Sequence, residues 1–197
     1  MTTITRPTSF IPRTCRLTLV PNQRVNAAPF GGSEQAIDLL NDRWLLNCEM
    51  PEGSFADGAM RDAFIDSMRG QVNTVALYHF AQPAPRGTVR GSMTLASSAA
   101  QGASSIVISG CSPSNGTILM GDMFGVGGLL LRAVADSSAV AGIATVQIAN
   151  RLRVAQSAGA PVTWDKPTTL FRLLSHTGVD FGHGRVSATS FDFGEAI

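Results

Sequence analysis

Stretches in which apolar and polar residues alternate dominate this sequence, and only one segment has the spacing of an amphipathic helix. In Cys15–Val20, Leu17 and Leu19 fall on one side and Arg16 and Thr18 on the other. The same alternation returns further along the chain in four apolar residues: Trp44, Leu46, Cys48 and Met50. This period of two is typical of strands with one buried face. We therefore expect a mainly β protein.

The one helix is predicted over residues 54–69. Ser54 and Asp57 form a Ser-x-x-Asp capping box, which satisfies the free backbone N–H groups of a first helical turn. Gly70 stands where a left-handed C-terminal cap belongs. The apolar stripe of this helix consists of residues at four-residue spacing: Ala56, Met60, Phe64 and Met68. The charged residues are expected to point away from the stripe: Arg61, Asp62 and Asp66.

The segment 82–87 contains two prolines and a glycine, and the composition of the chain changes after it. The following part is rich in Gly, Ser, Ala and aliphatic residues, with turn clusters between short apolar runs. Short strands joined by tight turns favour a small barrel. The predicted strands are Gly91–Leu95, Ser105–Ser109, Asp122–Val126, Leu129–Ala135, Ala141–Ile148 and Pro161–Trp164.

After Pro167 the aromatic, alternating pattern returns in residues 168–174 and 185–193. A stretch of about 30 residues cannot bury its own apolar face, so it needs strands from elsewhere in the chain. We therefore predict that residues 1–85 and 166–197 form one domain together. Residues 86–165 would then be an inserted domain.

Charge is scarce and nearly balanced. Fifteen Lys and Arg residues stand against fourteen Asp and Glu residues, which gives a formal net charge of +1, and only 15% of the chain is charged. A dedicated nucleic-acid binder normally carries a basic surface that neutralises phosphates, so this balance argues against that class. Few charges also reduce self-repulsion, and we expect other subunits to cover much of the surface.

The cysteines Cys15, Cys48 and Cys111 are odd in number and form no Cys-x-x-Cys pair. A secreted disulfide scaffold usually has a dense, even set, so we expect free thiols in a protein that folds in a reducing cytoplasm. The first twenty residues contain no apolar core typical of a signal peptide. The longest apolar run, at residues 129–131, is too short to cross a bilayer, so we expect no membrane insertion.

One group of residues has the chemistry of metal ligands: His176, Asp180 and His183. Their spacing on a glycine-containing loop would allow them to converge on one ion. No HExxH or paired Cys-x-x-Cys motif supports such a site, and a turn between two strands explains the same residues. We favour the turn.

Three other patterns are weaker. Gly125–Leu130 resembles the start of a dinucleotide loop, but its third glycine is missing and no helix follows, so we interpret it as a hairpin tip. Cys48 and His79, the latter in a further strand predicted over Asn73–Phe80, suggest a thiol–imidazole pair. Cys48 nevertheless shares a face with apolar residues, as a buried inert thiol does. Glu49 and Glu52 are an example of an acidic pair that could act in glycoside hydrolysis, but nothing in the sequence distinguishes them from ordinary surface charges. We therefore predict no catalytic residue, no metal site and no cofactor.

Six residues are candidates for contacts with partner molecules. The forked guanidinium of arginine is favoured at interfaces, where it pairs with carboxylates, and tryptophan is a frequent anchor there. Ordinary solvated arginines are the alternative. The candidates are Arg43, Trp44, Arg86, Arg151, Arg153 and Trp164.

Several short motifs follow one another along nearly the whole chain from Cys15. They are Arg43-Trp44, Met68-Arg69-Gly70, Pro85-Arg86-Gly87, Gly121-Asp122, Arg151-Leu152-Arg153, Phe171-Arg172-Leu173 and Phe193-Gly-Glu-Ala196. Their order resembles that of distal tail proteins and related minor tail proteins of siphophages, the long-tailed bacteriophages. The resemblance implies a β-sandwich with one helix, formed by both chain ends, and an inserted barrel similar to an OB-fold.

In that family six such domains usually close into a ring between the last ring of the tail tube and the baseplate hub. The resemblance therefore implies a structural virion protein rather than an enzyme. Its partners would be copies of itself in a hexamer, the tail tube protein, baseplate hub or tail-tip proteins, and side-fibre or receptor-binding proteins. DNA would only pass through the lumen. We expect assembly in the bacterial cytoplasm and a final location in the distal tail of the virion.

A function of another class stays open: the inserted barrel is a carbohydrate- or host-surface-binding module. A further alternative to the distal tail protein is another minor tail or tube protein. OB-like barrels bind oligosaccharides or single-stranded nucleic acid on one sheet face, usually by stacking on aromatic side chains. The insert has only Phe124 and Trp164 for that purpose. This shortage makes the binding module the weaker hypothesis.

Overall fold

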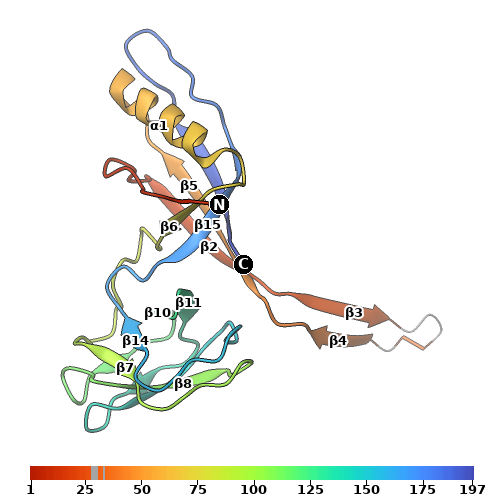
Figure 1. Cartoon of the computed structure of the whole chain (residues 1–197), viewed down its shortest axis with the longest axis vertical. Helices are drawn as coiled ribbons and strands as arrows, with labels where there is room; N and C mark the ends of the chain where they lie inside the picture. The colour runs from red at the N-terminus through yellow and green to blue at the C-terminus, as the bar shows by residue number, and fades with distance from the viewer. Residues whose placement is uncertain (28–30, 33) are drawn as a thin grey trace.

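The computed structural model describes residues 1–27, 31–32 and 34–197, and within them the chain is mainly β with one helix. It contains two six-stranded sheets, a short pair of strands and a two-stranded ribbon. The ribbon extends away from both sheets (Figure 1). Among the described residues, no helix has both the length and the apolar character needed to cross a membrane.

Both ends of the chain contribute to the first sheet, which we call the terminal sheet. Its strands lie in the order β1-β6-β15-β16-β5-β2, and all neighbours are antiparallel except β1 and β6. The bounds are β1 Thr3–Ile4, β2 Thr14–Val20, β5 Arg43–Met50, β6 Thr74–Leu77, β15 Thr169–His176 and β16 Thr189–Glu195. The two C-terminal strands thus pair with strands from the first part of the chain, as their apolar faces require.

One face of the terminal sheet carries an aromatic core. Burial alternates strictly along β5, and the four residues predicted to share a face are all buried there. Helix α1, Phe55–Met68, covers this face with Phe64 and Met68. Phe10, which the sequence pattern did not single out, is fully buried and packs against Phe64 and Phe191, with ring centroids 5.2 and 5.3 Å apart.

The predicted helix is confirmed, but of its predicted stripe only Phe64 and Met68 are buried, while Met60 is half-buried and Ala56 is exposed. Two further points differ from the prediction. Ser54 caps the N-terminus, and the reciprocal capping box with Asp57 is present. The left-handed backbone begins one residue earlier than predicted, at Arg69 with φ of 48°, and continues through Gly70. Arg61 does not point away from the core: it is 2% exposed, and its guanidinium donates to the carbonyl oxygens of Pro51 and Ser187. These two backbone acceptors offset part of the cost of burying the arginine, while its Nε has no hydrogen-bond partner among the described residues.

The second sheet, which we call the insert sheet, uses only strands from the middle of the chain. Its order is β11-β10-β14-β7-β8-β13. The bounds are β7 Met93–Leu95, β8 Ser105–Ser109, β10 Met123–Val126, β11 Leu129–Arg132, β13 Ala144–Gln147 and β14 Pro161–Thr163. All six predicted strands are present, most of them shorter than predicted. Beside them lie β9, Thr117–Ile118, and β12, Ser137–Ser138, which pair with each other.

The insert sheet curls, because a bridge between Ala133 and Ile148 joins the ends of its two edge strands. Its core is a separate apolar cluster drawn from residues 89–162. The core of the terminal sheet includes only Met123 and Leu130 from this part of the chain. The domain boundaries at 85/86 and 165/166 stay predictions, as do the sandwich and OB-like descriptions.

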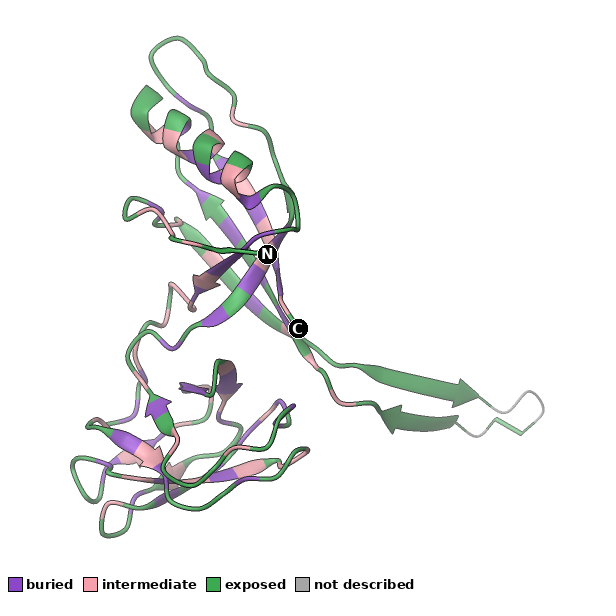
Figure 2. Ribbon diagram, in the orientation of Figure 1, coloured by how far each residue is buried: buried purple, intermediate pink, exposed green. Residues whose placement is uncertain are grey.

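The ribbon was not predicted. It consists of β3, Gln23–Ala27, and β4, Glu34–Asp38, which are antiparallel. Every residue of both strands is exposed (Figure 2). Each strand has a single large apolar residue, Val25 or Ile37, so the alternation that reveals a half-buried strand is absent. A strand whose side chains are all exposed leaves little trace in the hydrophobic pattern.

Candidate functional site

A buried carboxylate joins the two sheets. Glu195 is 4% exposed, and its side chain forms an ion pair with Arg153 of the insert. The same carboxylate accepts the backbone N–H of Trp44 and the hydroxyl of Thr169, each at 3.1 Å. Two of the six predicted contact residues, Trp44 and Arg153, are therefore buried inside a single chain, where they hold the insert against the terminal sheet.

The Trp44 indole contacts the insert directly. Its Nε1–H donates to the carbonyl oxygen of Leu130 at 2.7 Å. The guanidinium of Arg132 lies 4.6 Å from the ring centroid and donates to the carbonyl oxygen of Leu17. Burial lowers the pKa of Arg132 below its ordinary value, which fits a cation stacked on a covered aromatic face. We call Trp44, Leu130, Arg132, Arg153 and Glu195 the junction cluster.

Arg151 has a weaker partner at the base of the ribbon. Its guanidinium lies 2.9 Å from the Asp38 carboxylate, and both side chains are close to half exposed. Exposed pairs of this kind contribute little stability because water screens them. The contact nevertheless connects the insert to β4.

Arg86 belongs to a turn built around a buried aspartate. The Asp122 carboxylate is fully buried and accepts the backbone N–H groups of Arg86, Gly87 and Leu119 at 2.8, 3.1 and 2.8 Å. The exposed Arg86 side chain donates to the carbonyl oxygen of Met120. A Cβ on Gly87 would lie 2.2 Å from a backbone oxygen, so only glycine fits there. Two motifs far apart in sequence thus form one structure.

Trp164 and Arg43 lie outside these clusters. The Trp164 indole donates to the carbonyl oxygen of Gly91, and the Arg90 guanidinium lies 4.9 Å from its ring centroid. Phe124 is buried in the insert core. One face of Trp164 is therefore covered by Arg90, and Phe124 offers no ring for stacking. Arg43 is exposed on the terminal sheet.

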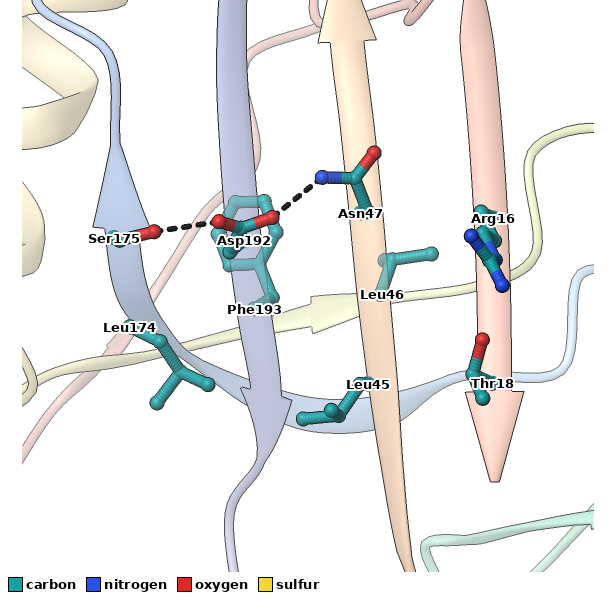
Figure 3. A pocket seen from close by; sticks show the side chains of 9 residues that line it. All are labelled: Arg16, Thr18, Leu45, Leu46, Asn47, Leu174, Ser175, Asp192 and Phe193. Atoms are coloured by element: carbon teal, nitrogen blue, oxygen red, sulfur yellow. Dashed lines mark hydrogen bonds between the residues drawn. The ribbon is translucent and has the colours of Figure 1, made fainter. Parts of the chain in front are cut away.

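The face of the terminal sheet opposite the aromatic core carries a groove of about 570 Å³ (Figure 3). Leu45 and Leu174 are exposed in this groove, on the side of their strands that points away from the core. Its centre is a hydrogen-bonded row in which the Asp192 carboxylate accepts from the Ser175 hydroxyl and the Asn47 amide, each at 2.5 Å. The groove offers an apolar floor and one carboxylate, and Arg16 lines its side.

The possible metal ligands do not form a site. His176, Asp180 and His183 are all exposed. His176 ends β15, and the other two lie in the segment that leads from β15 to β16. Within residues 1–27, 31–32 and 34–197, no three His, Cys, Asp or Glu side chains are grouped as metal ligands.

The other chemical candidates are explained by local structure. Gly127 and Gly128, both with positive φ, form the two-residue turn between β10 and β11, so the hairpin interpretation is confirmed. Cys48 is paired across the strands with Cys15, not with His79. Burial, followed by the charge of Arg132, lowers the pKa of His79. Glu49 accepts a hydrogen bond from Thr14, and Glu52 lies 3.7 Å from Arg185 on the surface.

Sequence reasoning missed the ribbon, the groove and the exact role of the junction cluster. The groove had a signal: Leu45 and Leu174 interrupt the polar side of alternating strands, which is unusual if that face meets only water. The burial of Glu195 left no signal in the sequence, because a single carboxylate near the end of a strand cannot be told from a surface charge until its partners are known.

No family model matches the chain, and no curated protein matches it.

Proposed function

We propose that this chain is a structural virion protein of a long-tailed phage. Copies of it form a ring that joins the tail tube to the baseplate hub or tail tip. The ring order proposed is six. The observation that carries the proposal is the ribbon β3–β4, whose strands are exposed along their whole length.

An isolated two-stranded ribbon is marginally stable in water, because it has no apolar face to bury. A surface on another molecule supplies that face. A second copy is the simplest source, since a head-to-tail contact repeated by rotation closes into a ring. Val25 pairs with Ala36 and Ile37 with Arg24, so these two exposed residues lie on opposite faces of the ribbon and would each provide an apolar contact on its own face.

The edges of the terminal sheet support the same proposal. Strand β2 is the last in the order and has a paired neighbour on one side only within the described residues. Its free N–H and C=O groups are a template for pairing with another chain. Both chain ends supply this sheet and the middle supplies a second one, which is the arrangement that the motif resemblance implies.

The finer fold belongs to the proposal. The terminal part would be the ring-forming β-sandwich, and residues 86–165 an OB-like barrel at its periphery. Tube and hub proteins, and side-fibre or receptor-binding proteins, would dock on the ring, and DNA would cross its lumen without specific contacts. The net charge of +1 agrees with a lumen that does not grip DNA.

The test compares the full chain with a variant that lacks the ribbon. Val20 and Arg43 are directly opposite in β2 and β5, so an Asn-Gly turn can replace residues 21–42 without changing the strand register. Native mass spectrometry and negative-stain electron microscopy should show rings for the full chain and monomers for the variant.

The matched control is Val140→Lys, since Val140 is 77% exposed and belongs to the insert rather than to the ribbon. This control should still form rings. A full chain that stays monomeric at high concentration would contradict the proposal. Rings formed by the variant without the ribbon would contradict the role given to β3–β4.

A further inference from the structure

Two cysteines face each other in the terminal sheet. Cys15 of β2 is the direct cross-strand partner of Cys48 of β5. Both side chains lie on the core side, because the next pairs in register on that face are Leu17 with Leu46 and Leu19 with Trp44. Opposed residues of antiparallel strands have Cα atoms about 4.5 or 5.5 Å apart. A disulfide spans about 4.4–6.8 Å, so either spacing permits one.

The two sulfur atoms have different surroundings. Cys48 is buried, whereas Cys15 is only partly buried at the edge strand. A hydrogen bond from the Cys48 thiol lowers the pKa of Cys15 to about 7, against the opposing effect of burial, with further help from the backbone of Phe80 and Ala81. The same contact and burial raise the pKa of Cys48. Cys15 is thus the more readily ionised thiol of the pair.

We propose that Cys15 and Cys48 are a site of reversible oxidation, where a peroxide converts the two thiols into an intramolecular disulfide. The Cys15 thiolate attacks one oxygen of the peroxide, the O–O bond breaks, and hydroxide leaves, forming a sulfenic acid. The Cys48 sulfur then attacks the Cys15 sulfur, and the S–O bond breaks. The thiol proton leaves with that second hydroxide as water, so two thiols and one hydrogen peroxide give one disulfide and two waters.

The cross-link would act on the base of the ribbon. Strands β3 and β4 lie in the chain between Cys15 and Cys48, so the disulfide closes a loop that contains the whole ribbon. It also fixes the edge strand β2 to its one neighbour in the terminal sheet. Fraying of β2, which would displace the ribbon, becomes covalently limited. Cys111 takes no part, because it lies in the insert core beside Met93.

The experiment treats the full chain with hydrogen peroxide, unfolds it, and alkylates the remaining thiols before mass spectrometry. The expected product has one alkylated cysteine, Cys111, and a peptide cross-link between Cys15 and Cys48. Its rate of formation should rise as the pH increases through about 7. Hydrogen exchange of β2 amides should slow in the oxidised chain and return after reduction with dithiothreitol.

The Cys111→Ser chain is the control and should form the same cross-link. Three alkylated cysteines after peroxide treatment would overturn the proposal. So would a Cys15 sulfinic acid beside an alkylated Cys48, or cross-links only between chains. These readouts use the native cysteine pair, so they do not depend on whether a Cys48 variant folds.

Discussion

The buried carboxylate of Glu195 is compensated by several partners. The Glu195 carboxylate is matched by one guanidinium, one backbone N–H and one hydroxyl. Moving a charged group from water into the protein interior costs roughly several kcal/mol unless such partners compensate for the lost hydration. The junction cluster therefore depends on each of its members more than an exposed ion pair does.

Replacing Arg153 by methionine should strongly destabilise the chain, because Glu195 would remain buried without its cation. The expected loss in the free energy of unfolding is about 3–5 kcal/mol. Arg151→Met is the matched control, since the half-exposed pair with Asp38 contributes about 0–1 kcal/mol. Urea denaturation of both variants measures the difference. Equal losses would show that the Glu195 pair is not the main contact between the sheets.

Asp122 provides a second test at this scale. The Asp122→Asn variant places an amide group where three backbone N–H groups now donate, so at least one of them loses its acceptor. Each buried donor left unsatisfied costs about 1–3 kcal/mol. Asp136→Asn is the control, because Asp136 accepts only the Met120 N–H at an exposed position. Thermal unfolding should show a clearly larger loss for Asp122→Asn.

Among the elements, helix α1 begins with a pH-dependent cap. Hydrogen bonds from the Ser54 hydroxyl and backbone N–H lower the pKa of Asp57 below its ordinary value of 3.8. A carboxyl group whose pKa is lower in the folded state stabilises the fold above the ordinary value. That stabilisation is lost as the pH falls through the lowered folded value.

The melting temperature of the native chain should therefore exceed that of Asp57→Asn at neutral pH. The gap should close only below about pH 4, as the carboxyl group becomes protonated. Thermal melts between pH 7 and pH 3 measure it. Asp66→Asn, near the other end of the helix, removes a carboxylate outside the capping box and should not reproduce this pattern. A gap that does not change with pH would refute the assigned cap.

Strands and helices could be predicted from the sequence where the pattern of their own residues determines them. The alternation of β5 and the Ser54–Asp57 cap are local patterns, and both are present in the structure. Arg61 was misplaced because its burial depends on acceptors from Pro51 and Ser187, which no local pattern reveals. The ribbon β3–β4 escaped prediction for the opposite reason: it buries nothing within the chain, so no apolar period marks it.

At the scale of the whole molecule, one strand serves two cores. In β11, Leu130 packs with the aromatic core of the terminal sheet, and the next residue, Leu131, packs in the core of the insert sheet. Successive residues of a strand point to opposite faces, so β11 lies between the two cores. These adjacent leucines, both fully buried, can therefore distinguish an insert that folds alone from one that needs the terminal sheet.

Residues 86–165 expressed alone should unfold cooperatively, because their apolar core is drawn from within that range. In this fragment Leu131→Ala should cost about 2–5 kcal/mol, as cavities in a packed core do, whereas Leu130→Ala should cost little, since its partners are absent. In the full chain both substitutions should be destabilising, because Leu130 is again enclosed by the terminal core. Chemical denaturation of the four proteins measures these differences. A fragment that does not fold would mean that the two sheets form a single cooperative unit. Equal costs of Leu130→Ala and Leu131→Ala in a folded fragment would contradict the assignment of Leu130 to the terminal core, since its burial would then not depend on the terminal strands.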